Sequence, residues 1–168
     1  MRGVLVFLVA LAVPEAVRAQ VSDPPGLERI GWLVGTWRAS AIAPDGSLET
    51  TEATYEWASH GRAIRYSLVR KGERDETTLE GICGYHPGKE RLVLWEVDGE
   101  GNVTEGVLTV NEAGQSHDET IYALDGSILP VRAEILREGE DAFRFQALVE
   151  KDGGWSLVFE RTYRRVRP

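Results

Sequence analysis

The fold is predicted most directly by residues 142–165, which read AFRFQALVEKDGGWSLVFERTYRR. In the first half of this stretch, apolar side chains alternate with polar ones, and the apolar set is Phe143, Phe145, Ala147 and Val149. After the turn residues 152–154 (DGG), the alternation continues with Trp155, Leu157, Phe159 and Tyr163. Because successive side chains of a strand point to opposite faces, a period of two indicates a strand with one buried face. The stretch therefore predicts a β-hairpin.

The same pattern extends back through most of the chain. Turn residues, mostly Gly with Asp, Pro or Glu, separate ten segments that are rich in β-branched and aromatic residues. We expect strands near residues 36–43, 48–58, 62–70, 76–86, 90–97, 103–110, 116–124, 128–137, 142–150 and 155–165. Short connections make neighbouring strands antiparallel, and closing the sheet removes its exposed edges. The prediction is an all-β fold, an up-and-down antiparallel barrel of about ten strands, with a two-sheet sandwich as the alternative.

A short helix is expected before the first strand. Residues 27–34 (LERIGWLV) place Leu27, Ile30 and Leu33 at helical spacing, and Gly35 ends the segment. We expect this N-terminal helix to cap one end of the barrel. Residues 27–168 then form a single β-barrel domain, and no second domain is indicated.

The first 19 residues have the pattern of a signal peptide. Arg2 precedes the apolar core 4–13 (VLVFLVALAV), and residues 17–19 (VRA) offer small side chains at the two positions that the signal peptidase reads. The apolar core is about half of the ~20 residues that a membrane-spanning helix needs. We expect cleavage after Ala19, a linker over residues 20–26, no membrane span, and a periplasmic or secreted mature protein.

Composition excludes several classes of function. The chain has 168 residues, a formal net charge of -8 and one cysteine. An acidic protein lacks the clustered Lys and Arg that nucleic acids require, so nucleic acid is not expected as a partner. A single cysteine excludes an internal disulfide and a multi-cysteine zinc site. Cys83 lies in an apolar strand and is interpreted as a small buried hydrophobe.

The barrel interior is the predicted functional region. A barrel of about ten strands is difficult to fill completely with side chains, so a cavity for a small molecule is expected. The aromatic residues in the middle of strands either line this cavity or fill it, and they are Trp57, Tyr66, Tyr85 and Trp95. His117 shares a strand face with Glu119, and Arg132 lies between Val131 and Ala133. Arg132 either orients the polar end of a ligand or is a solvent-facing or internally paired residue.

Catalytic and cofactor motifs are weak. The sequence contains no zinc-protease motif, nucleophile elbow, phosphate loop or dinucleotide fingerprint. The three histidines, His60, His86 and His117, are too far apart in sequence to predict a shared metal site. A single buried histidine in an apolar pocket is able to ligate haem iron, so haem binding is the alternative to a protein without a cofactor. No cofactor, metal ligand or catalytic residue is assigned from the sequence.

Several motifs resemble those of known β-barrel families. Residues 32–37 (WLVGTW), after a short helix, resemble the opening of calycin-type barrels, which include lipocalins, fatty-acid-binding proteins and nitrobindin-like haem barrels. Residues 81–87, 95–98 and 160–165 resemble a bacterial family of small exported barrels, which is catalogued as a domain of unknown function with a lipocalin-like fold. The resemblance implies a ten-stranded antiparallel barrel that binds a small apolar ligand, and it implies no reaction.

Three functions follow from these observations. The first is an exported barrel that binds a small hydrophobic or amphipathic molecule, with Trp57, Tyr66 and Trp95 as walls and Arg132 at the polar end. The second is a structural or interaction barrel with a filled interior. The third is a small barrel enzyme of the lyase or cyclase kind that uses Arg132, Glu134 and the interior tyrosines. The sequence does not decide whether the protein is an enzyme. Catalysis would require Arg132, Glu134 and the interior tyrosines to converge on one point.

Overall fold

The computed structural model describes residues 25–42, 46–73 and 75–167. The predicted signal peptide, residues 1–19, lies outside the described residues, as do residues 20–24 of the predicted linker. Among the described residues, neither helical segment is long and apolar enough to cross a membrane.

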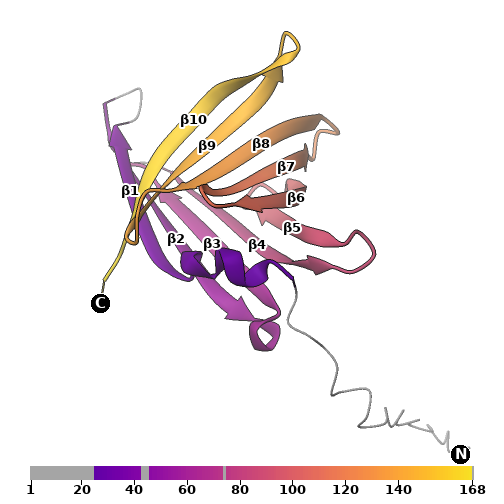
Figure 1. The fold of residues 1–168 in the computed structure, drawn as a ribbon. Helices are drawn as coiled ribbons and strands as arrows, with labels where there is room; N and C mark the ends of the chain where they lie inside the picture. Colours follow the sequence, from indigo (N-terminus) through magenta and orange to yellow (C-terminus); the bar gives the residue numbers. More distant parts are fainter. Residues whose placement is uncertain (1–24, 43–45, 74, 168) are drawn as a thin grey trace, which may run out of the picture.

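Ten strands and two short 3-10 helices make up the fold (Figure 1). Helix η2 (Leu27–Leu33) precedes the first strand, and η3 (Ser59–Gly61) connects the second and third strands. The strands are β1 (Gly35–Ile42), β2 (Leu48–Ala58), β3 (Ala63–Lys71), β4 (Glu76–His86), β5 (Arg91–Asp98), β6 (Val103–Asn111), β7 (Gly114–Tyr122), β8 (Ile128–Arg137), β9 (Ala142–Lys151) and β10 (Gly154–Arg165). Each strand lies where the sequence pattern predicts it, with ends that differ by two residues or fewer.

The strands form one closed antiparallel barrel in the order β1-β10-β9-β8-β7-β6-β5-β4-β3-β2. Each strand pairs with the strand that follows it in sequence, and β1 pairs with β10 to close the cylinder. The closed pairing confirms the predicted barrel and excludes the two-sheet sandwich. It also removes free sheet edges along most of the structure.

The closing seam between β1 and β10 is short. Its register contains only the pairs Trp37 with Arg165 and Arg38 with Arg164, and beyond them the two strands diverge toward the open end (Figure 1). There, side chains connect β10 with β2 inside the barrel, since Arg161 lies 2.8 Å from a carboxylate oxygen of Glu49. The barrel is therefore most tightly closed at the end where η2 lies.

Helix η2 and an aromatic cluster fill this closed end. Leu27, Ile30 and Leu33 of η2 are buried, as the helical spacing predicted. Next to them, the ring of Phe143 lies 4.9 Å from that of Trp37 and stacks at 4.8 Å on that of Tyr163. Burial of these large apolar surfaces is the main contribution to stability at this end of the barrel.

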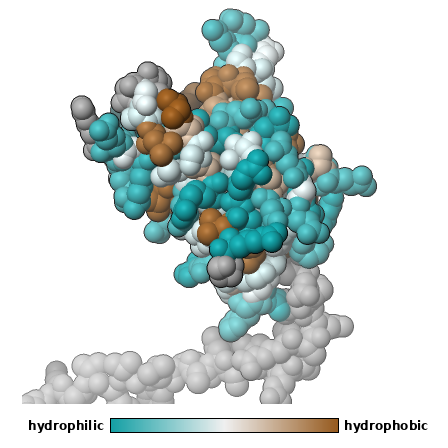
Figure 2. Space-filling view, turned by 90° about the vertical axis from the view of Figure 1, so that its left-hand side faces the viewer, coloured by the Kyte–Doolittle hydropathy of each residue, from teal (hydrophilic) through white to brown (hydrophobic). Residues whose placement is uncertain are grey.

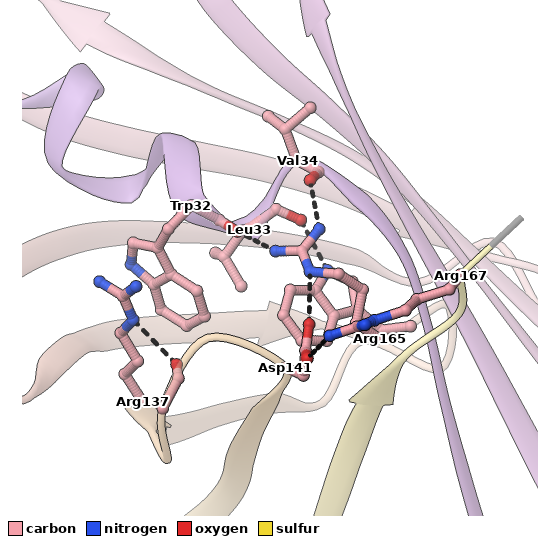
Figure 3. A network of polar contacts seen from close by, with 9 residues as sticks. Trp32, Leu33, Val34, Arg137, Asp141, Arg165 and Arg167 are labelled. Atoms are coloured by element: carbon pink, nitrogen blue, oxygen red, sulfur yellow. Dashed lines mark hydrogen bonds and ion pairs between the residues drawn. The ribbon is translucent and has the colours of Figure 1, made fainter.

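Arg165 anchors η2 to the barrel wall (Figure 3). Its guanidinium donates hydrogen bonds to the carbonyl oxygens of Trp32 at 2.8 Å and Val34 at 2.9 Å. The same group lies 4.1 Å from the ring centre of Trp37 and pairs with Asp141. Carbonyl groups at the end of a helix have no partner within it, so this arginine satisfies groups that would otherwise be unpaired.

Strand β10 departs from the predicted alternation. Its register with β9 shifts between Leu157 and Phe159, which marks a β-bulge. An extra residue reverses the faces on either side of a bulge. Phe159 lines the interior as expected, whereas Trp155 packs on the outside against Arg132, with 4.6 Å between the guanidinium carbon and the ring centre. The prediction that Trp155 and Leu157 share the inward face of Phe159 is therefore wrong.

The face of the molecule shown in Figure 2 is largely hydrophilic, with separate apolar patches. Exposed large apolar side chains occur on the outer wall and near the open end, and they include Ile42, Leu48, Leu124, Ile128 and Leu157. The site described below lies inside the barrel, where five strands, β2, β3, β5, β7 and β10, contribute polar side chains to an otherwise apolar core.

Candidate functional site

An inner chamber occupies the barrel between the closed end and the open mouth. Its volume is about 110 Å³. Ile30 and Leu33 of η2 form its floor, and apolar residues of β3, β4, β5, β6, β8 and β9 form most of its wall. Its polar lining consists of Tyr55, Tyr66, Glu96, Gln115, His117, Glu119 and Tyr163. An apolar enclosure with a few polar groups is typical of small-molecule sites.

A larger vestibule connects this chamber with the mouth. It has a volume of about 530 Å³, and its lining includes Arg70, Asp98 and Phe159. Four residues line both spaces, and they are Leu68, Leu79, Phe145 and Tyr163. A molecule that enters from the mouth therefore passes a mainly apolar ring before it reaches the inner polar groups.

Tyr66 and Glu96 form the first polar pair of the chamber. The hydroxyl of Tyr66, on β3, donates a hydrogen bond of 2.5 Å to Oε1 of Glu96, on β5. Strand β4 lies between them, and its Gly81 leaves the space that the phenol ring occupies. A Cβ at Gly81 would lie 2.5 Å from Cζ of Tyr66, which is closer than atoms pack in proteins. The missing side chain at Gly81 thus allows the pair to form.

Burial changes the acidity of this pair. Desolvation, with the negative charge of Glu119 nearby, raises the pKa of Glu96 from 4.5 to about 7, although the Tyr66 hydrogen bond opposes the rise. Desolvation also raises the pKa of Tyr66, and the nearby Glu96 charge adds to this effect. The neighbouring Tyr55 stacks on Tyr66 at 5.5 Å, and burial raises its pKa as well. Glu96 therefore changes its charge near neutral pH, while both tyrosines stay protonated.

His117 and Glu119 form the second polar pair, on the inner face of β7. Nδ1 of His117 lies 3.0 Å from Oε1 of Glu119, which confirms that the two residues share a face. On β6, Gly106 leaves room for the carboxylate, since a Cβ there would lie 2.9 Å from Cγ of Glu119. In the described part of the chain, Nε2 of His117 and Oε1 of the neighbouring Gln115 have no hydrogen-bond partner. A buried polar atom without a partner costs about 1–3 kcal/mol, so a hydrogen bond from a molecule in the chamber to either atom would be stabilising.

The chamber brings together two of the six residues that the sequence singled out for ligand binding, Tyr66 and His117. Trp57 and Tyr85 do not line it. Trp57 is 45% exposed and packs against η2, where a Cβ at Gly31 would lie 2.9 Å from its ring. Tyr85 is partly buried against the hydrophobic core.

Trp95 and Arg132 lie on the outer wall, so the prediction that they contact a ligand in the interior is wrong, and for Arg132 the solvent-facing alternative is confirmed. Trp95 is 47% exposed and pairs with the exposed Ile82 on the neighbouring strand. Arg132 lies 2.7 Å from Asp118 on the surface and stacks on Trp155. Val131 and Ala133 are buried, and the alternation of β8 turns the side chain between them outward.

The residue set of the proposed enzyme does not converge. Glu134 is paired across β7 and β9 with Ser116 and Gln146, on the same outer face as Arg132. Both are separated by the barrel wall from Tyr66. Arg132 and Glu134 therefore do not act on a molecule held in the chamber.

Sequence reasoning missed Glu96, Gln115 and Tyr55. In β5, Leu92, Leu94 and Glu96 alternate with Val93, Trp95 and Val97, so both faces carry apolar residues and the pattern alone does not show which face is buried. A usable signal was the pairing of two glycines with large polar residues. Gly81 and Gly106 are unfavourable inside strands unless a neighbouring group needs their space.

The cofactor alternative does not fit the described chamber. His117 is the histidine in the interior, but its chamber of about 110 Å³ is too small to enclose a porphyrin beside the ring. Within the described residues, no group of three or more His, Cys, Asp or Glu side chains is arranged to hold a metal ion. Cys83 lines the chamber as a buried thiol, and burial raises its pKa to about 12.

Comparison with known proteins bears on the fold. No protein-family model and no curated protein matches the sequence. The crystal structure of Rv2717c from M. tuberculosis aligns with a TM-score of 0.59 and 15% identity, over 87% of this chain and 100% of that chain. A de novo designed fluorescence-activating β-barrel aligns with a TM-score of 0.39 and 12% identity, over 82% and 96% of the two chains. EF1p2_mFAP2b bound to DFHBI aligns with a TM-score of 0.41 and 12% identity, over 83% and 99%. The alignment with Rv2717c shows a shared fold, which agrees with the antiparallel β-barrel expected from the sequence.

Proposed function

We propose that this protein binds a small amphipathic molecule inside the barrel. The proposal rests on the inner chamber. Apolar side chains enclose two buried polar pairs there, each of which contains a glutamate, and two polar atoms that have no hydrogen-bond partner. The polar end of the ligand lies in the chamber, and its apolar part extends past Leu68 and Leu79 into the vestibule.

The size and lining of the interior support binding over a purely structural role. Chamber and vestibule have volumes of about 110 Å³ and about 530 Å³, and together they fall in the ~300–1,000 Å³ range of small-molecule sites. A filled structural barrel would instead satisfy its buried polar atoms internally. Here the aromatic cluster fills only the closed end, and the space above it keeps polar atoms without partners.

The proposal is tested by titration with short-chain amphiphiles. Octanol, octylamine and octanoate each contain eight carbons in a linear chain and differ in the charge and chemistry of their head group. At least one of them is expected to bind at a single site by calorimetry and to raise the melting temperature, because a ligand that binds only the folded state stabilises it. If none of the three binds, the proposal is wrong.

A blocking variant locates the bound molecule. Leu79 lines both the chamber and the vestibule, so Leu79→Trp is expected to abolish binding by filling the passage. Ile82→Trp, on the outer face of the same strand, is the matched control and is expected to leave affinity unchanged, since Ile82 is 43% exposed. Circular dichroism and a cooperative thermal transition verify that both variants fold. Equal affinity of Leu79→Trp and the unmodified protein would place the ligand elsewhere.

Export is part of the proposal. The charged start, the apolar core and the small residues around Ala19 support removal of residues 1–19 on export to the periplasm or the medium. Mass spectrometry of the mature protein, produced from the full chain, is expected to show Gln20 at its N-terminus. An exported product that retains Met1 would contradict cleavage.

A further inference from the structure

The unpartnered and charged groups of the inner chamber are hydrogen-bond acceptors. Gln115 is 4% exposed and His117 is 7% exposed, yet Oε1 of the first and Nε2 of the second have no partner in the described part of the chain. They occupy positions two residues apart on β7, whose inner face both share. Two orphaned atoms on adjacent positions of one cavity wall indicate that a bound group supplies the missing hydrogen bonds.

The hydrogen-bond partner of His117 determines what its free nitrogen does. A carboxylate accepts hydrogen bonds and does not donate them, so in the neutral form of the ring the contact with Glu119 favours the tautomer that carries its proton on Nδ1. Nε2 then presents a lone pair. The amide oxygen of Gln115 is also an acceptor. Both atoms therefore require a donor on the ligand.

The charged groups around these two atoms also favour a ligand that donates hydrogen bonds, because they attract a positive charge. The carboxylates of Glu96 and Glu119 both line the chamber, and they are close enough for the charge of one to affect the other. No Lys or Arg is among the described residues that line the chamber. A ligand carboxylate would face two acidic groups without a cation, whereas an ammonium group would be attracted to them.

We infer that the inner chamber is a subsite for the ammonium head group of an apolar amine. The inference rests on the proposed function and specifies the chemistry of its ligand. An ammonium group has three donors and no acceptor, and it can serve Nε2 of His117, Oε1 of Gln115 and a carboxylate oxygen at once. The alkyl chain then extends along Leu68, Leu79 and Phe145, the apolar residues shared by chamber and vestibule.

The three octyl probes separate the inference from the proposed function. Near neutral pH, octylamine is expected to bind at least ~10-fold more tightly than octanoate, with octanol in between, because the head groups differ in charge; the one methylene by which the chain of octanoate is shorter accounts for only about 0.8 kcal/mol. Binding of octanoate with equal or greater affinity than octylamine would overturn the inference and leave a binding barrel. Absence of binding by all three probes would overturn both.

Two single substitutions test the contacts themselves. Glu96→Gln removes one carboxylate, and Gln115→Leu removes one orphaned acceptor, so each is expected to weaken octylamine binding by roughly 10-fold while octanol changes by less than about 3-fold. Glu105→Gln, an exposed position on β6, is the matched control and is expected to leave both affinities unchanged. If Glu96→Gln and Gln115→Leu weaken the binding of octanol as much as that of octylamine, the chamber does not recognise the ammonium group.

Discussion

The buried carboxyl of Glu96 predicts an unusual dependence of stability on pH. Its pKa is about 7 in the folded protein and 4.5 when the group is fully solvated, as in the unfolded chain. Between these values the folded state binds more protons than the unfolded state, so the free energy of unfolding falls as pH rises. This loss of stability is absent below about pH 4.5 and complete above about pH 7. Replacement by Gln, which never ionises, is expected to remove it.

The size of the effect follows from the same two values. The gap between 4.5 and about 7, at about 1.4 kcal/mol for each pH unit, corresponds to about 3 kcal/mol. The amide oxygen of Gln at position 96 still accepts the hydrogen bond from Tyr66, so packing and the polar contact are kept. We therefore expect Glu96→Gln to be about 3 kcal/mol more stable than the unmodified protein at about pH 8.5, and nearly equal to it at about pH 4.5.

Urea denaturation at a series of pH values measures this difference. The titratable groups that line the chamber with Glu96 include Glu119, Tyr66, Tyr55 and His117, and all are present in both proteins. The difference between the two profiles therefore reports the ionisation of Glu96 together with its coupling to Glu119 and Tyr66. Glu105→Gln, on the outer face, is expected to reproduce the pH profile of the unmodified protein. Parallel stability profiles for Glu96→Gln and the unmodified protein would show that Glu96 is not the buried acid described here.

Three further predictions concern packing and the closed end. Phe143→Ala removes the 1% exposed centre of the aromatic cluster and is expected to lower the free energy of unfolding by about 3–5 kcal/mol in urea denaturation; a loss below about 1 kcal/mol would contradict the packing described. Arg165→Lys removes the guanidinium group that binds two carbonyl oxygens at the end of η2. Amide hydrogen exchange in η2 is therefore expected to accelerate, while exchange in β5 stays slow. Equal exchange rates of η2 in the variant and the unmodified protein would argue against the anchoring role of Arg165. Gly81→Ala displaces the ring of Tyr66 from Glu96 and is expected to raise the pKa of Glu96 in carboxyl NMR titrations, whereas Gly84→Ala, whose Cβ would meet its nearest atoms at 3.7 Å, leaves it unchanged. A pKa that stays the same in Gly81→Ala would refute the role of that glycine.

The amphiphile titrations have the most direct bearing on function, because they address ligand binding and ligand charge with one set of probes. Octanol, octylamine and octanoate test the binding barrel, and their order of affinity tests the ammonium subsite. The outer residues Trp95 and Arg132, which sequence reasoning placed at the ligand, are expected to tolerate replacement without loss of affinity. Calorimetry with Arg132→Ala checks this, and a loss of affinity would return that surface to consideration.

The strand pattern was predictable because it depends on local properties. Alternation and turn residues located all ten strands, and the spacing of Leu27, Ile30 and Leu33 predicted the helix at the closed end. The need to pair every strand edge favoured a closed barrel over an open sheet. These features follow from neighbouring residues and from the general cost of unpaired backbone groups, so one sequence was sufficient.

The identity of the site was decided by the tertiary structure. Where both faces of a strand are apolar, as in β5, alternation separates Glu96 from Trp95 but does not say which one points inward, and cross-strand neighbours determine the answer. The bulge in β10, which reversed the faces of Trp155 and Leu157, likewise depends on the pairing of β10 with its neighbour β9. Tyr66 and Glu96 are 30 residues apart and meet only through the register of β3, β4 and β5. The sequence by itself thus determined the strands and their closure, whereas the closed register determined which polar groups lie inside.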